Sequence, residues 1–175
     1  MTKLGIDIVD LSDPQIQRRN ERTLQLVLSA EDKTLEHPNL YWLLWSAKEA
    51  IFKCHREAWN FSPTQIPVAL SEIDGAISFT SENLSGIIRV TESYILAVCA
   101  DALMDVAYET LHTDQVGNGT VLRKHILSFF ERQDVGVEIG SDDLNLPVLE
   151  PGSLPLSISH HYHWSAFAYP KRLTE

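Results

Sequence analysis

The first apolar run of the chain, residues 3–9, contains a single acid, Asp7, between two isoleucines. Its β-branched residues favour a strand, and its nearly continuous apolar character indicates that both faces of this strand are covered. A lone carboxylate in a covered strand is poorly solvated, so Asp7 must be protonated, hydrogen-bonded or bound to a metal ion. For this fragment alone, a hydrogen-bonded structural aspartate or a strand-end cap is the plain alternative to a functional acid.

Two groups of elements, each a helix followed by strands, come after this first strand. A helix is expected over residues 13–28, with Pro at its first helical position, and Ser29 is the next N-cap. The strongest helical pattern spans residues 38–59. The other expected elements are an antiparallel meander of strands over 75–79, 86–91 and 94–100, a helix over 121–132, and strands over 135–139, 146–149, 156–159 and 164–169.

The repeated order of helix and strands predicts an α+β fold built from two similar helix-plus-antiparallel-sheet halves. Residues 112–120, which contain the turn-forming sequence Gly117-Asn118-Gly119, are the expected boundary. This divides the chain into a first half at residues 1–111 and a second half at residues 112–175. No residue-level repeat accompanies the pattern, so the predicted duplication rests on the order of elements alone.

Charge and cysteine content narrow the functional classes. The chain has 175 residues and a formal net charge of −10, which argues against a general nucleic-acid binder because phosphate contacts need Lys and Arg. Cys54 and Cys99 lie in apolar stretches and are expected to be reduced core thiols. The longest apolar run is too short to span a bilayer, and no hydrophobic targeting segment precedes Asp7. We therefore expect a cytoplasmic protein without a membrane partner.

Glu49 interrupts an aromatic stripe on the strongest predicted helix. Continuing the spacing of Trp42 and Trp45 by four places reaches Glu49. Phe52 follows three places later, so the carboxylate stands where a hydrophobic side chain is expected. An exposed ion pair with Lys53 is the competing interpretation, but such a pair contributes only about 0.3–0.5 kcal/mol and does not explain the interruption. We favour a functional or metal-binding role for Glu49.

Hydroxyl and imidazole side chains are concentrated in residues 157–164. In a continuing strand, alternation would separate His160 from His161 and His163, which disfavours a three-histidine zinc site, although a turn after His160 would break the alternation. The adjacent Ser159 and His160 cannot easily form a nucleophile pair and lack a third orienting group. A serine hydrolase is therefore disfavoured.

Arg18, Arg19 and Arg22 form the densest basic cluster of this acidic chain. Helical spacing places Arg18 and Arg22 on one face of the predicted helix. A solvated helix face is the ordinary explanation for such a cluster. The functional alternative is a docking strip for an acidic partner.

Three short motifs occur in a defined order along the chain. They are GIDIVD at residues 5–10, WSAKEAIFK at residues 45–53 and LSISH at residues 156–160. In this order they resemble the signatures of the 4′-phosphopantetheinyl transferase superfamily, with the motif order of its short, holo-acyl-carrier-protein synthase branch. The longer branch fuses two similar halves, and residues 1–110 look like its second half while residues 119–170 look like its first. The resemblance therefore implies a permuted pseudo-dimer.

The resemblance also implies an activity. Members of this superfamily move 4′-phosphopantetheine from coenzyme A to a serine of an acyl or peptidyl carrier protein, with Mg²⁺ at the reacting phosphates. By this resemblance Asp7 and Glu49 are metal ligands. Glu49 would also orient or deprotonate the serine, directly or through water, and Lys53 would be a second catalytic residue that contacts the coenzyme phosphates.

Further binding residues follow from the same resemblance. Ser159 and His160 match positions beside the coenzyme, and the helix with Arg18, Arg19 and Arg22 matches the place where the short branch docks its carrier. Two family features are missing, namely the glycines soon after the second motif and the lysine of a G-K-P-like segment near residues 145–147. The alternative hypothesis is therefore a non-catalytic homologue that binds a carrier protein or a nucleotide.

Overall fold

The computed structural model describes residues 3–16, 21–55, 60–114 and 119–173. The strands are β1 (Leu4–Asp10), β2 (Ala69–Ile73), β3 (Ala76–Ser81), β4 (Leu84–Val90), β5 (Tyr94–Ala100), β6 (Val106–His112), β7 (Glu138–Ser141), β8 (Pro147–Glu150), β9 (Leu154–Pro155), β10 (Ser157–His161) and β11 (Trp164–Pro170). The helices are α1 (Glu21–Leu24), α2 (Leu40–His55) and α3 (Gly119–Glu131).

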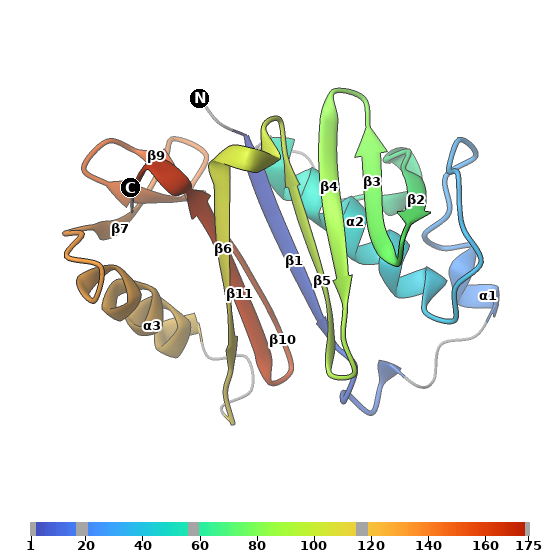
Figure 1. The fold of residues 1–175 in the computed structure, drawn as a ribbon, viewed down its shortest axis with the longest axis horizontal. Helices are drawn as coiled ribbons and strands as arrows, with labels where there is room; N and C mark the ends of the chain where they lie inside the picture. The colour runs from blue at the N-terminus through green and yellow to red at the C-terminus, as the bar shows by residue number, and fades with distance from the viewer. Residues whose placement is uncertain (1–2, 17–20, 56–59, 115–118, 174–175) are drawn as a thin grey trace.

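The strands form three antiparallel sheets. Their orders are β1-β5-β4-β3-β2, β10-β11-β6 and β7-β8-β9. Figure 1 shows α3 at one end of the molecule and the five-stranded sheet towards the other, with the β10-β11-β6 sheet between them. The predicted α+β class and the predicted meander of β3, β4 and β5 are confirmed.

Strand β1 is buried along its whole length because its two faces pack against different partners. Leu4, Ile6 and Ile8 belong to a core shared with the β10-β11-β6 sheet. The alternate residues Gly5 and Val9 face α2. β1 is also an edge strand, since β5 pairs with only one of its two edges. The strand therefore lies at the junction of helix, first sheet and second sheet.

Helix α2 rests directly on the backbone of β1. A Cβ atom at Gly5 would lie 2.0 Å from the Ala50 carbonyl oxygen and 2.7 Å from the Cys54 nitrogen, so only glycine fits this contact. The helix face towards the sheet includes the small residues Ala47 and Ala50, both fully buried. The aromatic stripe of the sequence pattern is thus not the main core face of this helix, because Trp45 and Phe52 remain partly exposed.

Helix α3 packs differently, on a layer of aromatic rings. Phe130 contacts Tyr169 edge to face, with ring centroids 5.0 Å apart, and Phe129 contacts Phe167 in the same manner at 5.5 Å. Phe130 and Phe167 are fully buried. Such pairs add to the free energy of burial while separating the two backbones by the width of a ring.

The two halves share one feature of strand order. β1 pairs with β5 and β5 with β4, while β6 pairs with β11 and β11 with β10. β6 crosses the predicted boundary at residues 111 and 112, and if it is counted with the second half, each half begins with a strand that pairs with the last strand of that half. This is the order that a duplication requires, and the pseudo-dimer stays a prediction, as do the boundaries at 111 and 112.

The helix predicted over residues 13–28 is wrong for most of its described length. Residues 14–15 form a turn, and α1 covers four residues only. Asp13 Oδ1 accepts the Gln15 N–H at 2.8 Å, and Asp32 Oδ2 accepts the Ser29 N–H at 2.8 Å. These side chains satisfy the backbone locally and so compete with helix formation. Ser29 accordingly precedes a turn and does not cap a helix.

Several other expectations can be compared with the structure. Among the described residues, no helix combines the length and the apolar character needed to cross a bilayer. Cys54 and Cys99 are buried free thiols, and the hydrogen bond between them, together with burial, raises the pKa of Cys99.

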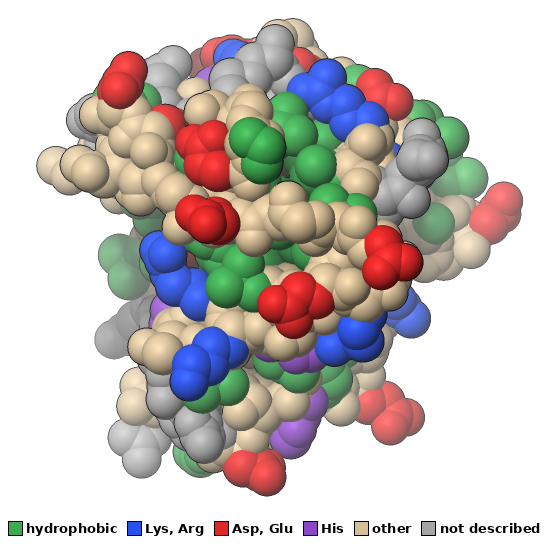
Figure 2. Space-filling view, turned by 90° about the vertical axis from the view of Figure 1, so that its left-hand side faces the viewer, with side chains coloured by type: hydrophobic (Ala, Val, Ile, Leu, Met, Phe, Trp, Pro, Cys, Tyr) green, Lys and Arg blue, Asp and Glu red, His purple; other side chains and the backbone are tan. Residues whose placement is uncertain are grey.

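On the face at the α3 end of the molecule, acidic and basic side chains are interspersed with apolar ones (Figure 2).

Candidate active site

Asp7 lies in the middle of β1 and faces α2. It is 3% exposed. Its Oδ1 accepts hydrogen bonds from Ser159 Oγ at 2.7 Å and from Lys53 Nζ at 3.1 Å. Its Oδ2 is buried and has no hydrogen-bond partner among the residues that the structure describes. One oxygen of this carboxylate is therefore held by the protein, and the other remains available to a ligand.

Glu49 approaches Asp7 from α2. Its Oε2 accepts the indole N–H of Trp45 at 2.9 Å, and its Oε1 pairs with Lys53 Nζ at 3.1 Å. Trp45 itself packs edge to face on Phe61, with ring centroids 5.4 Å apart. The ion pair considered for Glu49 and Lys53 thus forms, but the same lysine also reaches Asp7. The two predicted metal ligands converge on one ammonium group.

Lys53 has used all of its hydrogen-bonding capacity. An ammonium group carries three donors, and Nζ lies 3.1 Å from each of Ile6 O, Asp7 Oδ1 and Glu49 Oε1. Burial opposes the charge of this ammonium, but Asp7 and Glu49 outweigh that effect and raise the pKa of Lys53. A phosphate can be bound by Lys53 only if one of the three present contacts is released.

The environment of Asp7 fits a divalent cation. Burial raises the pKa of Asp7 to about 6, although Lys53 lowers it, and Glu49 raises it further. A buried carboxylate oxygen without a partner is costly, and a hard cation such as Mg²⁺ prefers oxygen ligands. Within the described parts of the chain, no three His, Cys, Asp or Glu side chains gather into a metal-binding group. Asp7 and Glu49 would therefore need water or substrate oxygens to complete the coordination.

The second half contacts β1 through a row of side chains on β10. Ser157 Oγ accepts the Ile6 N–H at 3.1 Å, and Ser159 Oγ accepts the Ile8 N–H at 3.2 Å. In the same way His161 Nδ1 accepts the N–H of Asp10 at 3.1 Å. These alternate residues satisfy the outer edge of β1 with side chains. The period-two spacing of Ser157, Ser159 and His161 is a sequence signal for this contact, and sequence reasoning did not use it.

The two residues predicted to lie beside the coenzyme take different positions. Ser159 is buried between β10 and β1, where it is bonded to both Asp7 and Ile8. His160 points the other way along the alternation and is exposed. It lines a hollow of about 240 Å³ together with Asp7, Trp45 and Glu49. Coenzyme contacts by Ser159 and His160 stay predictions.

A second hollow lies against Lys53. It has a volume of about 220 Å³ and is lined by Phe52 and Lys53 of α2, by Leu146 and Pro147, and by residues of β10 and the segment before it. Its walls are mostly apolar, with Lys53 as the charged group. Lys53 is thus located between this hollow and the carboxylates that line the first one.

Lys48, the lysine of the KEA motif, lies on the opposite side of α2 and is fully buried. Its Nζ pairs with Asp32 at 2.6 Å and donates to the carbonyl groups of Val27 and Pro63. Burial lowers the pKa of Lys48. Asp32 Oδ1 also accepts the Val68 N–H at 2.8 Å. The pair connects α2 to the segments before and after it, a structural role that sequence reasoning missed.

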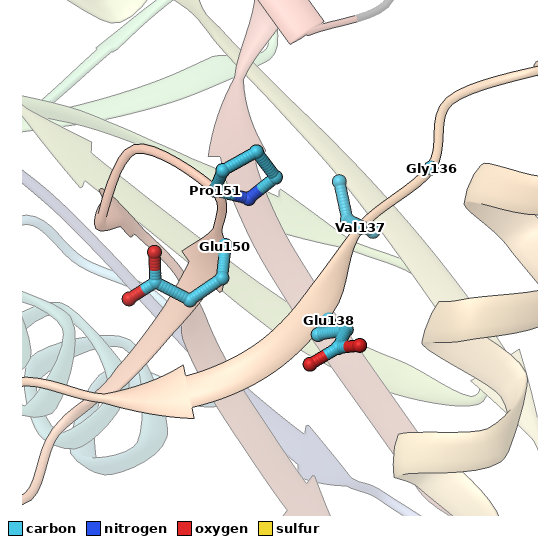
Figure 3. Close-up of a pocket in the computed structure, with 5 residues that line it drawn as sticks. All are labelled: Gly136, Val137, Glu138, Glu150 and Pro151. Atoms are coloured by element: carbon cyan, nitrogen blue, oxygen red, sulfur yellow. The ribbon is translucent and has the colours of Figure 1, made fainter.

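Two other predicted or apparent sites lie elsewhere. Arg18 and Arg19 lie outside the described residues, and so does the side chain of Arg22. A third hollow has a volume of about 490 Å³ and is lined by Glu138 at the start of β7, by Glu150 at the end of β8, and by the adjoining residues Gly136, Val137 and Pro151 (Figure 3). It shares no lining residue with the hollow that Asp7 and Glu49 line.

Comparison with known proteins identifies one family. Residues 3–99 match the family model described as the 4′-phosphopantetheinyl transferase superfamily, and this segment is more than half of the chain. It contains Asp7, Glu49 and Lys53 but not β10. No curated protein and no solved structure matched the chain.

Proposed function

This chain belongs to the 4′-phosphopantetheinyl transferase superfamily, and we propose that it transfers 4′-phosphopantetheine from coenzyme A to a serine of an acyl or peptidyl carrier protein. In this proposal Asp7 and Glu49 bind Mg²⁺, as in a holo-acyl-carrier-protein synthase. Glu49 and Lys53 are the catalytic residues.

The reaction exchanges a phosphoanhydride bond of coenzyme A for a phosphate ester bond to the serine. The serine Oγ attacks the phosphorus that carries the pantetheine arm, and the bridging P–O bond breaks to release adenosine 3′,5′-bisphosphate. The serine proton passes to Glu49 or to a water molecule that Glu49 holds. When bound, Mg²⁺ would neutralise the negative charge that builds on the phosphate oxygens.

The two hollows suggest how the substrates approach. The hollow with Trp45, Glu49 and His160 would admit the carrier serine, because Glu49, the proposed proton acceptor, lines it. The hollow beside Lys53 would hold part of the coenzyme, because Lys53 is its cation. Lys53 would then exchange one of its carboxylate contacts for a coenzyme phosphate.

One observation carries the proposal. Two carboxylates from distant parts of the matched segment meet at Lys53 Nζ, at 3.1 Å each, and the buried Oδ2 of Asp7 has no partner in the described parts of the chain. A structural aspartate would be expected to have both oxygens satisfied. A buried unsatisfied oxygen beside a second carboxylate is instead what a cation-binding site requires.

Mass spectrometry tests the activity directly. The chain is incubated with coenzyme A, Mg²⁺ and a panel of apo carrier proteins from the organism that encodes it. We expect the mass of at least one carrier to increase by one phosphopantetheine arm. If every carrier stays unmodified while carriers or nucleotides still bind, the protein is a non-catalytic homologue and the transferase proposal is abandoned.

Glu49→Gln provides the variant for this assay. Glutamine keeps the shape and can still accept the Trp45 hydrogen bond, but it removes a metal-binding charge. We expect transfer to be abolished while the circular dichroism spectrum and melting temperature stay close to those of the wild type. Wild-type turnover by this variant would contradict the assignment of Glu49.

A further inference from the structure

We propose that Ser159 is a positioning residue for Asp7, and that through it the second half of the chain controls the cation site of the first half. This inference rests on the proposed function, because it takes Asp7 as a metal ligand. It assigns Ser159 a role other than direct contact with the coenzyme.

The hydrogen bonds of Ser159 fix the direction of its hydroxyl proton. A serine hydroxyl has one donor and two acceptor lone pairs. The Ile8 N–H donates to Oγ at 3.2 Å, and Oγ lies 2.7 Å from Asp7 Oδ1. Because a carboxylate can only accept, the single hydroxyl proton points to Oδ1. Ser159 thereby selects which oxygen of Asp7 is held and leaves Oδ2 available to the cation.

Lys53 cannot hold Oδ1 of Asp7 throughout the reaction. It also contacts Oδ1, but the same ammonium is shared with Ile6 O and Glu49. In the proposed function Lys53 binds a coenzyme phosphate, and to do so it must release one of these three contacts. Ser159 has no such second task, since it is 5% exposed and fixed to the backbone of β1. It can hold Oδ1 before and after the coenzyme binds.

Ser157 is a matched control on the same strand. Its hydroxyl accepts the Ile6 N–H at 3.1 Å, as Ser159 accepts the Ile8 N–H, and both serines are 5% exposed. Among the hydrogen bonds of the described residues, Ser157 has none to Asp7. Alanine at either position therefore removes one buried bond to β1, but only alanine at 159 removes a bond to the carboxylate.

The test measures cation binding without turnover. Mn²⁺ alone is titrated into the full-length wild type, Ser159→Ala and Ser157→Ala, and the free ion is followed by its electron paramagnetic resonance signal. We expect Ser159→Ala to weaken Mn²⁺ binding by about 10- to 100-fold, as the loss of a hydrogen bond to a metal ligand usually does. Ser157→Ala should bind Mn²⁺ like the wild type, although both variants lose thermal stability through the bond to the backbone of β1.

Ser159→Cys keeps the test valid if the alanine variant does not fold. The thiol has nearly the same shape but is a weak donor, so we expect a smaller loss of Mn²⁺ affinity in the same direction. Equal weakening in the Ser157 and Ser159 variants, unchanged affinity in Ser159→Ala, or no binding by the wild type would each overturn the positioning role. Selective weakening in the Ser159 variants, with every carrier left unmodified by the wild type, would support the role of Ser159 and contradict transferase activity.

Discussion

Helices α2 and α3 cover their sheets in opposite ways. α2 lies against β1 through Gly5 and small helix residues, so that helix and strand meet backbone to backbone. α3 lies on the rings of Phe167 and Tyr169. A backbone contact has no rotamers to adjust, whereas an aromatic layer can repack. The half that carries both candidate ligands is therefore the half in which the distance between helix and strand is most tightly fixed.

This difference has a functional meaning. Asp7 comes from β1 and Glu49 from α2, so the separation of their carboxylates depends on how closely these two elements approach. The second half contributes to the site through side chains at the edge of β1 and through residues that line the two hollows. Close packing is needed where geometry matters, and a looser layer suffices where it does not.

Gly5→Ala should have the largest effect on stability, because it disrupts the backbone contact between α2 and β1. The added methyl would meet the Ala50 carbonyl oxygen at 2.0 Å, and backbone atoms cannot rotate away as a side chain can. We expect a loss of more than about 4 kcal/mol in the free energy of unfolding, measured by urea denaturation. Gly136→Ala in the second half is the control, because a Cβ there meets nothing within 4 Å. A wild-type midpoint for Gly5→Ala would show that α2 can move away from β1.

Lys48→Met tests the buried ion pair on the other side of α2. The substitution leaves Asp32 as an unpaired buried charge, which should cost about 3–5 kcal/mol in urea denaturation. Adding Asp32→Leu should recover only part of this loss, because Asp32 also accepts the N–H groups of Ser29 and Val68. Full recovery in the double variant would mean that only the charge of Asp32, and not its hydrogen bonds, matters here.

Asp7→Asn should stabilise the protein while abolishing transfer. Asparagine resembles the protonated carboxyl group, so the variant avoids burying a charge. Because the folded-state pKa of about 6 exceeds the ordinary value of 3.8, the wild type loses stability relative to the variant as pH rises through this window. The difference should reach on the order of 3 kcal/mol above pH 6. Urea denaturation with EDTA across pH 4–7.5 measures it, and a constant difference would contradict the raised pKa.

Phe129→Leu should have the smallest effect, because α3 rests on an adjustable layer. Phe129 is partly exposed and contacts several other rings. We expect a loss of under about 1.5 kcal/mol, with unchanged Mn²⁺ affinity. Ala50→Val makes the corresponding test in the first half and should cost more, as it inserts methyl groups between α2 and β1. Similar losses for both variants would remove the contrast between the two helices.

Most of the regular structure could be predicted from the sequence, and the exceptions have two causes. The strands β3, β4, β5 and β11 show period-two or continuous apolar patterns. β2 and β6 were missed, because a half-exposed strand such as residues 106–112 has little alternation. The helix expected over residues 13–28 fails where Asp and Ser side chains bond to nearby N–H groups, and propensity alone does not weigh that competition.

The acidic residues of the candidate site could be predicted from the sequence, but the residues that hydrogen-bond to them could not. Asp7 and Glu49 each violate an apolar pattern, and a buried charge in such a position is visible in the sequence. The hydrogen bond from Trp45 and the one from Ser159 leave no such trace, since Trp and Ser fit their surroundings in other ways. Lys48 looked like an ordinary helix residue, and its burial depends on the distant Asp32. These contacts arise from tertiary packing, so only the structure reveals them.

The bond between Ser159 and Asp7 joins residues 152 positions apart, and this sets the order in which the site can be assembled during synthesis. While the ribosome is still adding β10, the outer N–H groups of β1 have no partner and form an open edge, the kind of surface that invites pairing with other chains. Strand β10 closes that edge with the side chains of Ser157, Ser159 and His161, which accept the N–H groups of β1. Emergence of β10, closure of the edge of β1 and orientation of Asp7 are thus one event.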